Sequence, residues 1–439
     1  MPAAVLFLFY ILVVCTPLAL ATVQGQPPRG VWDELAAGAG MAGLAILLVE
    51  FVLSGRFRSI SGNIGMDITM RLHQLLARSA AVLIVLHPFL YRGQQSLDPR
   101  QLPPGSGALD FGFDGLWPGI IAWLLLGALM VMAIGRDALY RHEHWRLTHG
   151  VMALIVAALG VLHATRAGQY SREPVLTWVW GSLLGIAVLS LLWVYVIKPI
   201  WKRAHLWRVS RVRKLADRTW ELRLVPEGHD GLRYAPGHFA WISIGRSAFS
   251  LNENPFSIAS APSDGSELRF VIKELGDFTN HIGEVATGTR AYVDAPFGAL
   301  TLKGHESAAG LCLIAGGVGI APTLSHLRAL NAAEDPRPRL LIYGNRHTGQ
   351  IVHGDALSQM ARDTPLTLVH VLSDPPDGWT GETGFVRRDL LERYIDENAR
   401  QAWVFILCGP PPMLHMVETA LLEMGVPARH ILSEQFSYD

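Results

Sequence analysis

Four histidines in two apolar stretches are the residues of this sequence best suited to hold a metal group. His73 and His87 lie on one stretch, His149 and His163 on another, and each pair is fourteen residues apart. Fourteen residues make roughly 1400° of α-helix, so each pair should share one helix face with about 21 Å between its members. Two such helices side by side would form two stacked bis-histidine sites, which suit the axial ligation of haem better than a structural zinc.

The alternative for these histidines is hydrogen bonding within a helix bundle. Ionisable side chains are costly inside a bilayer and usually functional there, so four at one spacing favour ligands. Arg71 and Arg146 stand at the starts of the same two stretches, where they either meet haem propionates or lie at the membrane surface. The two remaining charges that need an account, Glu50 and Arg78, are predicted to pair with each other.

The histidines need apolar helices to carry them, and the first half of the chain supplies these helices. Half of the 439 residues are hydrophobic and only 17% are charged, which places part of the protein in lipid. Six apolar runs each approach the length of about 20 residues that crosses a bilayer. They lie at 3–23, 35–53, 72–91, 116–134, 147–165 and 175–197. We predict a six-helix transmembrane haem domain over residues 1–205.

Basic residues in the loops predict the orientation of a multi-pass protein in the cell membrane. Thirteen Lys and Arg residues follow the second, fourth and sixth runs, against five in the opposite loops. Because basic loops stay on the cytoplasmic side, the second half of the chain is predicted to be cytoplasmic and the loop 92–115 to face outward. The first run is either a retained helix or a signal peptide cleaved after Ala21, and it lacks the preceding basic residue of a signal peptide.

Charge and cysteine content exclude several classes of protein. The chain has 37 basic and 37 acidic side chains, which leaves no excess of charge and disfavours a nucleic-acid partner. Its three cysteines, Cys15, Cys312 and Cys408, have no CxxC spacing, which argues against a disulfide framework and a cysteine-ligated iron–sulfur cluster.

The second half of the chain changes from apolar runs to short strands and helices. Residues 206–305 alternate apolar and polar positions between glycine and proline turns, which predicts a small antiparallel β-barrel. Residues 306–439 alternate strands with helices, which predicts a parallel sheet in an α/β domain. The expected fold class is therefore multidomain, with an all-α bundle followed by the barrel and the α/β domain.

Two turns in this half are suited to hold phosphate groups. Gly276 and Thr279 lie between a strand and an expected helix, whose N-terminal N–H groups could hold a pyrophosphate. The glycine-rich turn Gly316–Pro322 joins a buried strand to a helix expected from about Thr323, and its glycines allow a diphosphate to approach the backbone.

Two later strands also end in turns with functional residue types. One ends before Arg346, whose guanidinium suits a 2′-phosphate and so favours NADPH, and the other ends at Cys408, followed by Gly409 and Pro410. Ligands collect at such carboxyl ends of parallel strands.

With these parts in this order, the chain resembles the ferric reductase and NADPH oxidase superfamily, a six-helix bis-haem membrane domain fused to a ferredoxin–NADP reductase-like dehydrogenase. The resemblance covers nearly the whole chain and includes the Asn254–Ile258 element and the terminal Glu434-Gln435-Phe436. It implies FAD, two b-type haems and NADPH or NADH as cofactors. Asn254 departs from the family's usual histidine, and Tyr91 stands where oxidases often carry a second histidine.

The resemblance further implies which residues meet the cofactors. The aromatic ring of Phe436 would cover the flavin, Glu434 belongs to the same terminal element, and Cys408 would border the nicotinamide without acting as a nucleophile. The residues implied to bind FAD or the nicotinamide nucleotide are His238, Pro255, Phe256, Ser257, Ile258, Ile272, Lys273, Gly276, Thr279, Gly316, Gly317, Gly319, Pro322, Thr323, Arg346, Gly409 and Pro410.

The function implied by the resemblance is electron transfer across the membrane. Electrons would pass from NADPH or NADH through FAD, the haem at His73 and His149 and the haem at His87 and His163 to dioxygen or ferric iron outside. A second interpretation is a protein that delivers electrons to a periplasmic or membrane protein partner. A third makes the helices a bare anchor for a flavin reductase.

Overall fold

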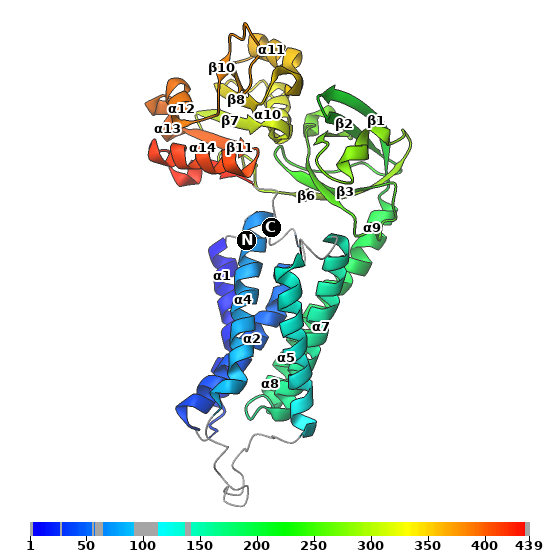
Figure 1. Ribbon diagram of the computed structural model, residues 1–439, viewed down its shortest axis with the longest axis vertical. Helices are drawn as coiled ribbons and strands as arrows, with labels where there is room; N and C mark the ends of the chain where they lie inside the picture. Colours follow the sequence, from blue (N-terminus) through cyan, green and yellow to red (C-terminus); the bar gives the residue numbers. More distant parts are fainter. Residues whose placement is uncertain are drawn as a thin grey trace, which may run out of the picture. The chain divides into compact units, whose positions relative to one another are not determined.

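The computed structural model describes residues 3–26, 29–54, 57, 65–91, 113–136 and 142–434. The chain divides into two compact units, one of residues 1–64 and 68–199 and the other of residues 65–67 and 200–439 (Figure 1). The first unit is helical, and the second contains both sheets.

The first unit is a bundle of membrane-length helices, as predicted. The described residues contain six helices long and apolar enough to cross a bilayer. They are α1 (Ala3–Val23), α2 (Val31–Leu53), α4 (Met66–Leu90), α5 (Phe113–Ile134), α7 (His142–Ala167) and α8 (Pro174–Leu192). A π-helical turn (Trp193–Ile197) and α9 (Lys198–Ala204) continue α8. Helices α4 and α7 begin several residues before their apolar runs because their first turns are polar and extend the helix beyond its apolar part.

Small residues let these helices approach one another closely. A side chain at Gly43 of α2 would lie 2.7 Å from Ile84 of α4, so only glycine permits this spacing. Trp180 of α8 is fully buried and donates from its indole nitrogen to the Ser171 hydroxyl at 3.0 Å. Helix α2 packs against α1 and α8, and α5 packs along α7.

The first sheet of the second unit is antiparallel, as predicted for a flavin domain. Its order is β4-β3-β6-β1-β2-β5. The strands are β1 (Trp207–Ala216), β2 (Thr219–Pro226), β3 (Phe239–Ile244), β4 (Asn254–Ser257), β5 (Leu268–Lys273) and β6 (Arg290–Phe297). A bridge between Ile258 and Phe270 joins the two ends of this order, which curls the sheet toward a closed barrel around an apolar core.

A buried ion pair fixes the loop that precedes β4. Lys202 of α9 pairs with Glu253, and both side chains are almost completely buried. Glu253 immediately precedes the Asn254–Ser257 strand, so this pair holds the end of α9 against the start of that strand.

The second sheet is parallel throughout, as the alternation of strands and helices predicts. Its order is β10-β9-β8-β7-β11-β12. The strands are β7 (Gly310–Gly316), β8 (Arg339–Asn345), β9 (Leu366–Leu372), β10 (Glu382–Thr383), β11 (Trp403–Cys408) and β12 (Ile431–Ser433), and the helices are α10 (Ile320–Ala332), α11 (Gly354–Asp363), α12 (Arg388–Tyr394), α13 (Glu397–Ala402) and α14 (Pro411–Glu423). The order reverses between β7 and β11, which makes their carboxyl ends the topological switch point where such sheets bind ligands.

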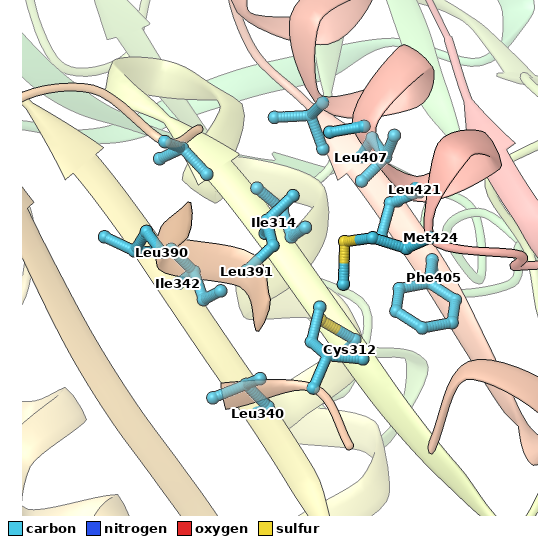
Figure 2. Packing of buried hydrophobic residues seen from close by; sticks show 14 of the residues in the cluster. Cys312, Ile314, Leu340, Ile342, Leu390, Leu391, Phe405, Leu407, Leu421 and Met424 are labelled. Carbon is cyan, nitrogen blue, oxygen red and sulfur yellow. The ribbon is translucent and has the colours of Figure 1, made fainter. Parts of the chain in front are cut away.

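Helices cover the parallel sheet with apolar side chains. Figure 2 shows Cys312, Ile314 and Phe405 of the central strands beneath Leu391 of α12 and Leu421 of α14. Strands β7 and β11 are almost entirely buried and read as unbroken apolar runs, as expected for central strands of a parallel sheet.

Candidate functional site

The structure brings the membrane histidines together in two pairs. The ring centroids of His73 on α4 and His149 on α7 are 6.4 Å apart. Those of His87 and His163, on the same two helices, are 6.5 Å apart. A metal bound to one nitrogen of each ring at about 2 Å, the usual metal–imidazole distance, requires centroids roughly 6 Å apart. Both pairs therefore have the spacing of two axial ligands on one metal.

The second nitrogen of each ring has a different environment. His73 donates from Nδ1 to Glu50 Oε2 at 2.6 Å. His87 Nδ1 bonds the carbonyl oxygen of Ile84 at 2.6 Å, and His163 Nδ1 bonds that of Gly115 at 3.2 Å. A proton on Nδ1 leaves the Nε2 lone pair available to a metal.

After the predicted orientation, we call His73 with His149 the inner pair and His87 with His163 the outer pair. The ring of His149 stands beside Trp145 with centroids 4.8 Å apart. Among the described residues, the buried Nδ1 of His149 has no hydrogen-bond partner. The inner pair therefore combines one ring bonded to a carboxylate with one ring whose Nδ1 bonds none of the described residues, whereas both outer rings bond carbonyl oxygens.

The predicted pair of Glu50 and Arg78 is wrong. Glu50 is buried, and its two carboxylate oxygens bond His73 and the hydroxyl of Tyr10, which donates at 3.3 Å. Arg78 is exposed on the surface of α4. Glu50 and Arg78 do lie on α2 and α4, as predicted. However, α2 packs against α4 with Glu50 facing the side of α4 that carries the histidines, so the carboxylate bonds His73.

A cavity of about 890 Å³ adjoins the outer pair of histidines. Its walls are mainly apolar and come from α2, α4, α5 and α7, and His87 and His163 line it. Two glycines make room for the rings: a side chain at Gly40 would touch His87 at 3.4 Å, and one at Gly119 would lie 2.6 Å from His163 Nδ1. This volume falls within the range of ligand and cofactor pockets, about 300–1,000 Å³.

The histidine pairs do not form a metal site by themselves. In the part of the chain that the structure describes, no three His, Cys, Asp or Glu side chains gather as a metal site. A metal at either pair would need further ligands from a bound cofactor, as a haem iron has from its porphyrin.

The two arginines near the inner pair differ in exposure. Arg71 is exposed on α4, two residues before His73. Arg146 is half-buried on α7, and its carbonyl oxygen accepts a hydrogen bond from Tyr195 at 3.1 Å. The interpretation that they meet propionates stays a prediction.

The residues predicted to contact flavin lie on β4 and the turn beside it. The four residues Asn254–Ser257 form β4 and are half-buried. Ile258 follows and donates its N–H to the carbonyl oxygen of His238 at 2.9 Å. The His238 ring accepts the N–H of Ala235 at 2.9 Å, which fixes the turn that leads into β3. His238 and Ile258, remote in sequence, are thus neighbours.

The turn after β5 is closed by its own threonine. The hydroxyl oxygen of Thr279 accepts the N–H groups of Leu275 and Gly276 at 2.9 and 3.0 Å. The helix expected after this turn is only a 3-10 helix, Thr279–Glu284. Ile272 is 1% exposed and packs in the barrel core, so it can offer a cofactor only its backbone, whereas Lys273 ends β5 half-buried.

The two glycine-containing motifs of the α/β domain meet at the switch point. A side chain at Gly319 would collide with the carbonyl oxygen of Cys408, and one at Gly409 would lie 3.1 Å from the backbone nitrogen of Gly316. Only glycine permits these contacts, and Gly317 also has a positive φ of 53°.

Helix α10 begins directly after this turn, at Ile320 rather than near Thr323, so Pro322 and Thr323 lie in its first turn. Both side chains are buried, and among the described residues the hydroxyl of Thr323 has no hydrogen-bond partner. The N–H groups at the start of this helix and the adjoining glycine backbone are suited to a diphosphate.

Cys408 and Glu434 lie close together near this point. Burial and the negative charge of Glu434 raise the pKa of the Cys408 thiol to about 12. The thiol therefore stays protonated at neutral pH. That Cys408 borders the nicotinamide without acting as a nucleophile stays a prediction. Glu434 is 2% exposed and lies against Gly298. Phe436, predicted to cover the flavin, lies outside the described residues.

An acidic neighbour of Arg346 was not anticipated from the sequence. The Arg346 guanidinium lies 3.7 Å from the Asp374 carboxylate, and both side chains are largely exposed. A carboxylate here would repel a 2′-phosphate, which weakens the preference for NADPH inferred from Arg346. The signal that could have revealed Asp374 is its position just after β9, the neighbour of β8 in the sheet.

Three known protein families match consecutive regions of the chain. Residues 39–160 match the ferric reductase like transmembrane component family. Residues 208–313 match an FAD-binding domain family, and residues 313–419 match the oxidoreductase NAD-binding domain family.

Curated relatives match part of the chain. NADH-cytochrome b5 reductase 1 of Lodderomyces elongisporus is 34% identical over 35% of this chain and 51% of its own length. The protein of the same name from Debaryomyces hansenii is 33% identical over 35% of this chain and 54% of its own length. The xylene/toluene monooxygenase electron transfer component XylA of Pseudomonas putida is 27% identical over 52% of this chain and 64% of its own length. The chain therefore spans about half the length of these relatives.

Among solved structures, the flavohemoglobin of Malassezia yamatoensis with bound FAD and heme has a TM-score of 0.52 at 15% identity, over 93% of this chain and 99% of its own. At that identity the likeness concerns the fold alone.

Proposed function

Since the chain has the arrangement of the ferric reductase and NADPH oxidase superfamily, with a ferric reductase-like transmembrane component followed by FAD- and NAD-binding domains, we propose that it is a flavocytochrome b. It would carry electrons from cytoplasmic NAD(P)H across the cell membrane to an acceptor outside.

The observation that carries this proposal is the spacing of the two histidine pairs. Centroid distances of 6.4 and 6.5 Å suit a metal between each pair of rings. The mainly apolar cavity of about 890 Å³ at the outer pair suits a large planar cofactor. His73 with His149 would hold one b-type haem, and His87 with His163 would hold the other.

The cofactors supply the redox chemistry: a flavin takes two electrons as hydride and releases them singly, as haem iron requires. The chain supplies binding and position. Glycine backbone at Gly316–Gly319 and the start of α10 would hold the nucleotide diphosphate, and the turn closed by Thr279 would hold that of FAD. The protonated Cys408 would border the nicotinamide without reacting with it.

The experiment that tests the proposal is a spectrum of the purified full-length protein. We expect two b-type haems per chain, with the reduced bands of bis-imidazole iron, and reduction of both by NAD(P)H. His163→Ala should retain one haem and its reduction but lose electron delivery to the far side of vesicles. Protein that binds FAD but shows no b-type bands would overturn the proposal in favour of a flavin reductase with a helical anchor.

The acceptor is proposed to be dioxygen, giving superoxide, or chelated ferric iron. Stopped-flow reduction with NADPH and with NADH, followed by addition of oxygen or a ferric chelate, ranks both donor and acceptor. Reoxidation by neither acceptor would overturn this part of the proposal.

A second candidate function is the delivery of electrons to a protein partner. The relative named as an electron transfer component supports it, because that protein aligns over 52% of this chain. Under this candidate, oxidation of NAD(P)H by purified protein would be slow with small acceptors and would increase when other membrane proteins are restored. Equal rates with and without those proteins would exclude it.

A further inference from the structure

We propose that Glu50 is a positioning residue that lowers the midpoint potential of the inner haem through His73. This inference rests on the proposed function, since it requires a haem iron between His73 and His149. It assigns a role to a carboxylate on α2, whereas the ligand His73 lies on α4.

The first observation is the contact itself. Glu50 Oε2 accepts the Nδ1 proton of His73 at 2.6 Å, and Glu50 is 4% exposed. Its other oxygen accepts the hydroxyl of Tyr10 at 3.3 Å. A carboxylate within a membrane helix is costly, and such residues are retained mainly where they serve a function. Here Glu50 is held from both sides by side chains of α1 and α4.

The second observation is the contrast among the four histidines. His87 and His163 bond backbone carbonyl oxygens, which are neutral. His149 bonds no group among the described residues through its Nδ1. Of these four histidines, only His73 bonds a carboxylate among the described residues, so the charge distinguishes the inner site from the outer one.

Such a contact has a known physical effect on a ligand. A carboxylate that accepts the second N–H of a metal-bound imidazole fixes its tautomer and raises the basicity of the ligating nitrogen. A more basic ligand and a nearby negative charge both stabilise the ferric over the ferrous state. An iron held by His73 and His149 would therefore have a lower midpoint potential than one held by His87 and His163, whose Nδ1 atoms bond only neutral carbonyl oxygens.

A structural role would leave a different signature. If Glu50 serves only to hold α2 against α4, its replacement would lower stability or haem content without moving a potential. The measurement must therefore be the potential of each haem, followed by its absorption band in an anaerobic redox titration of the full-length protein.

The test variant is Glu50→Gln, which keeps an acceptor oxygen for His73 and removes the charge. We expect one of the two midpoint potentials to rise by at least about 59 mV, the equivalent of a tenfold change in the ferric-to-ferrous ratio for one electron. The other potential should not move. The same change in a His163→Ala background, which keeps only the inner haem, should move the remaining potential.

The matched control is Tyr10→Phe, which keeps the carboxylate but removes the hydrogen bond that draws its charge away from His73. It should lower the same midpoint potential, so that the ferric-to-ferrous ratio at a fixed potential rises at least twofold. If Glu50→Gln fails to bind haem, this variant alone tests the inference. Unchanged potentials in the variants, or equal shifts of both haems, would overturn the inference. Wild-type protein without b-type haem would instead overturn the proposed function.

Discussion

If the proposed function holds, a methyl group added at Gly119 should expel the haem proposed between His87 and His163. The Cβ atom of an alanine there would lie 2.6, 2.7 and 2.8 Å from three atoms of the His163 ring. The shortest of these distances is 0.8 Å below the 3.4 Å at which ordinary contact begins. The ring must therefore retreat by nearly 1 Å, which exceeds the tolerance of about 0.5 Å within which functional groups must be held. The His163 bond to the Gly115 carbonyl oxygen, already 3.2 Å long, would be lost as well.

We expect Gly119→Ala to reduce the haem content from two per chain to one, measured by the pyridine haemochrome assay against FAD. The control is Gly127→Ala in the same helix, where no heavy atom lies within 4 Å of the added Cβ. It adds the same methyl group to α5 and should keep both haems. Two haems with unchanged spectra in Gly119→Ala would refute the assignment of His163 as a ligand.

Three further predictions concern the second unit. Asp374→Asn should raise kcat/KM for NADPH relative to NADH up to about fivefold, since an exposed charge pair contributes about 0.2–1 kcal/mol and Asp374 lies beside Arg346. Lys202→Met removes the positive charge from the buried ion pair with Glu253 and should lower the free energy of unfolding by about 3–5 kcal/mol, whereas exposed Arg203→Met should not. Burial lowers the pKa of His326 from 6.5 to about 4, so only the unfolded chain gains this proton between those pH values. The free energy of unfolding should therefore fall by up to about 3 kcal/mol as the pH is lowered from 6.5 to about 4, and the fall should be smaller in His326→Gln.

The architecture was predictable because each layer has its own period in the sequence. Apolar runs of membrane length fixed the six helices, and alternation in the second half separated the antiparallel from the parallel sheet. The first residues of α4 and α7 were not predictable, because hydropathy marks the part of a helix that lies in lipid and not the polar turns that extend beyond it. The 3-10 helix Thr279–Glu284 was also missed, since a single turn has no period to detect.

Contacts between elements were predictable only where both partners lay on strands or helices whose order could be inferred. The two histidine pairs could be predicted because the histidines have the same spacing on two helices. The contact between Gly319 and Cys408 requires the adjacency of β7 and β11, which was not predicted from the sequence. The partner of Arg346 required the order of β8 and β9, which the sequence did not provide.

The error at Glu50 shows where the helical wheel stops being informative. A wheel gives the face of one helix that a residue occupies, but it does not give the rotation of that helix against its neighbour. Depth alone made Arg78 a reasonable partner, because opposite charges in a bilayer gain most by pairing. Gly43 lies against Ile84 where α2 meets α4, and the rotation of α2 in this packing points the carboxylate toward His73. Because a Cβ atom at position 43 would lie 2.7 Å from Ile84, a larger residue there should move α2 away from α4 and weaken the bond between Glu50 and His73 without altering either of them.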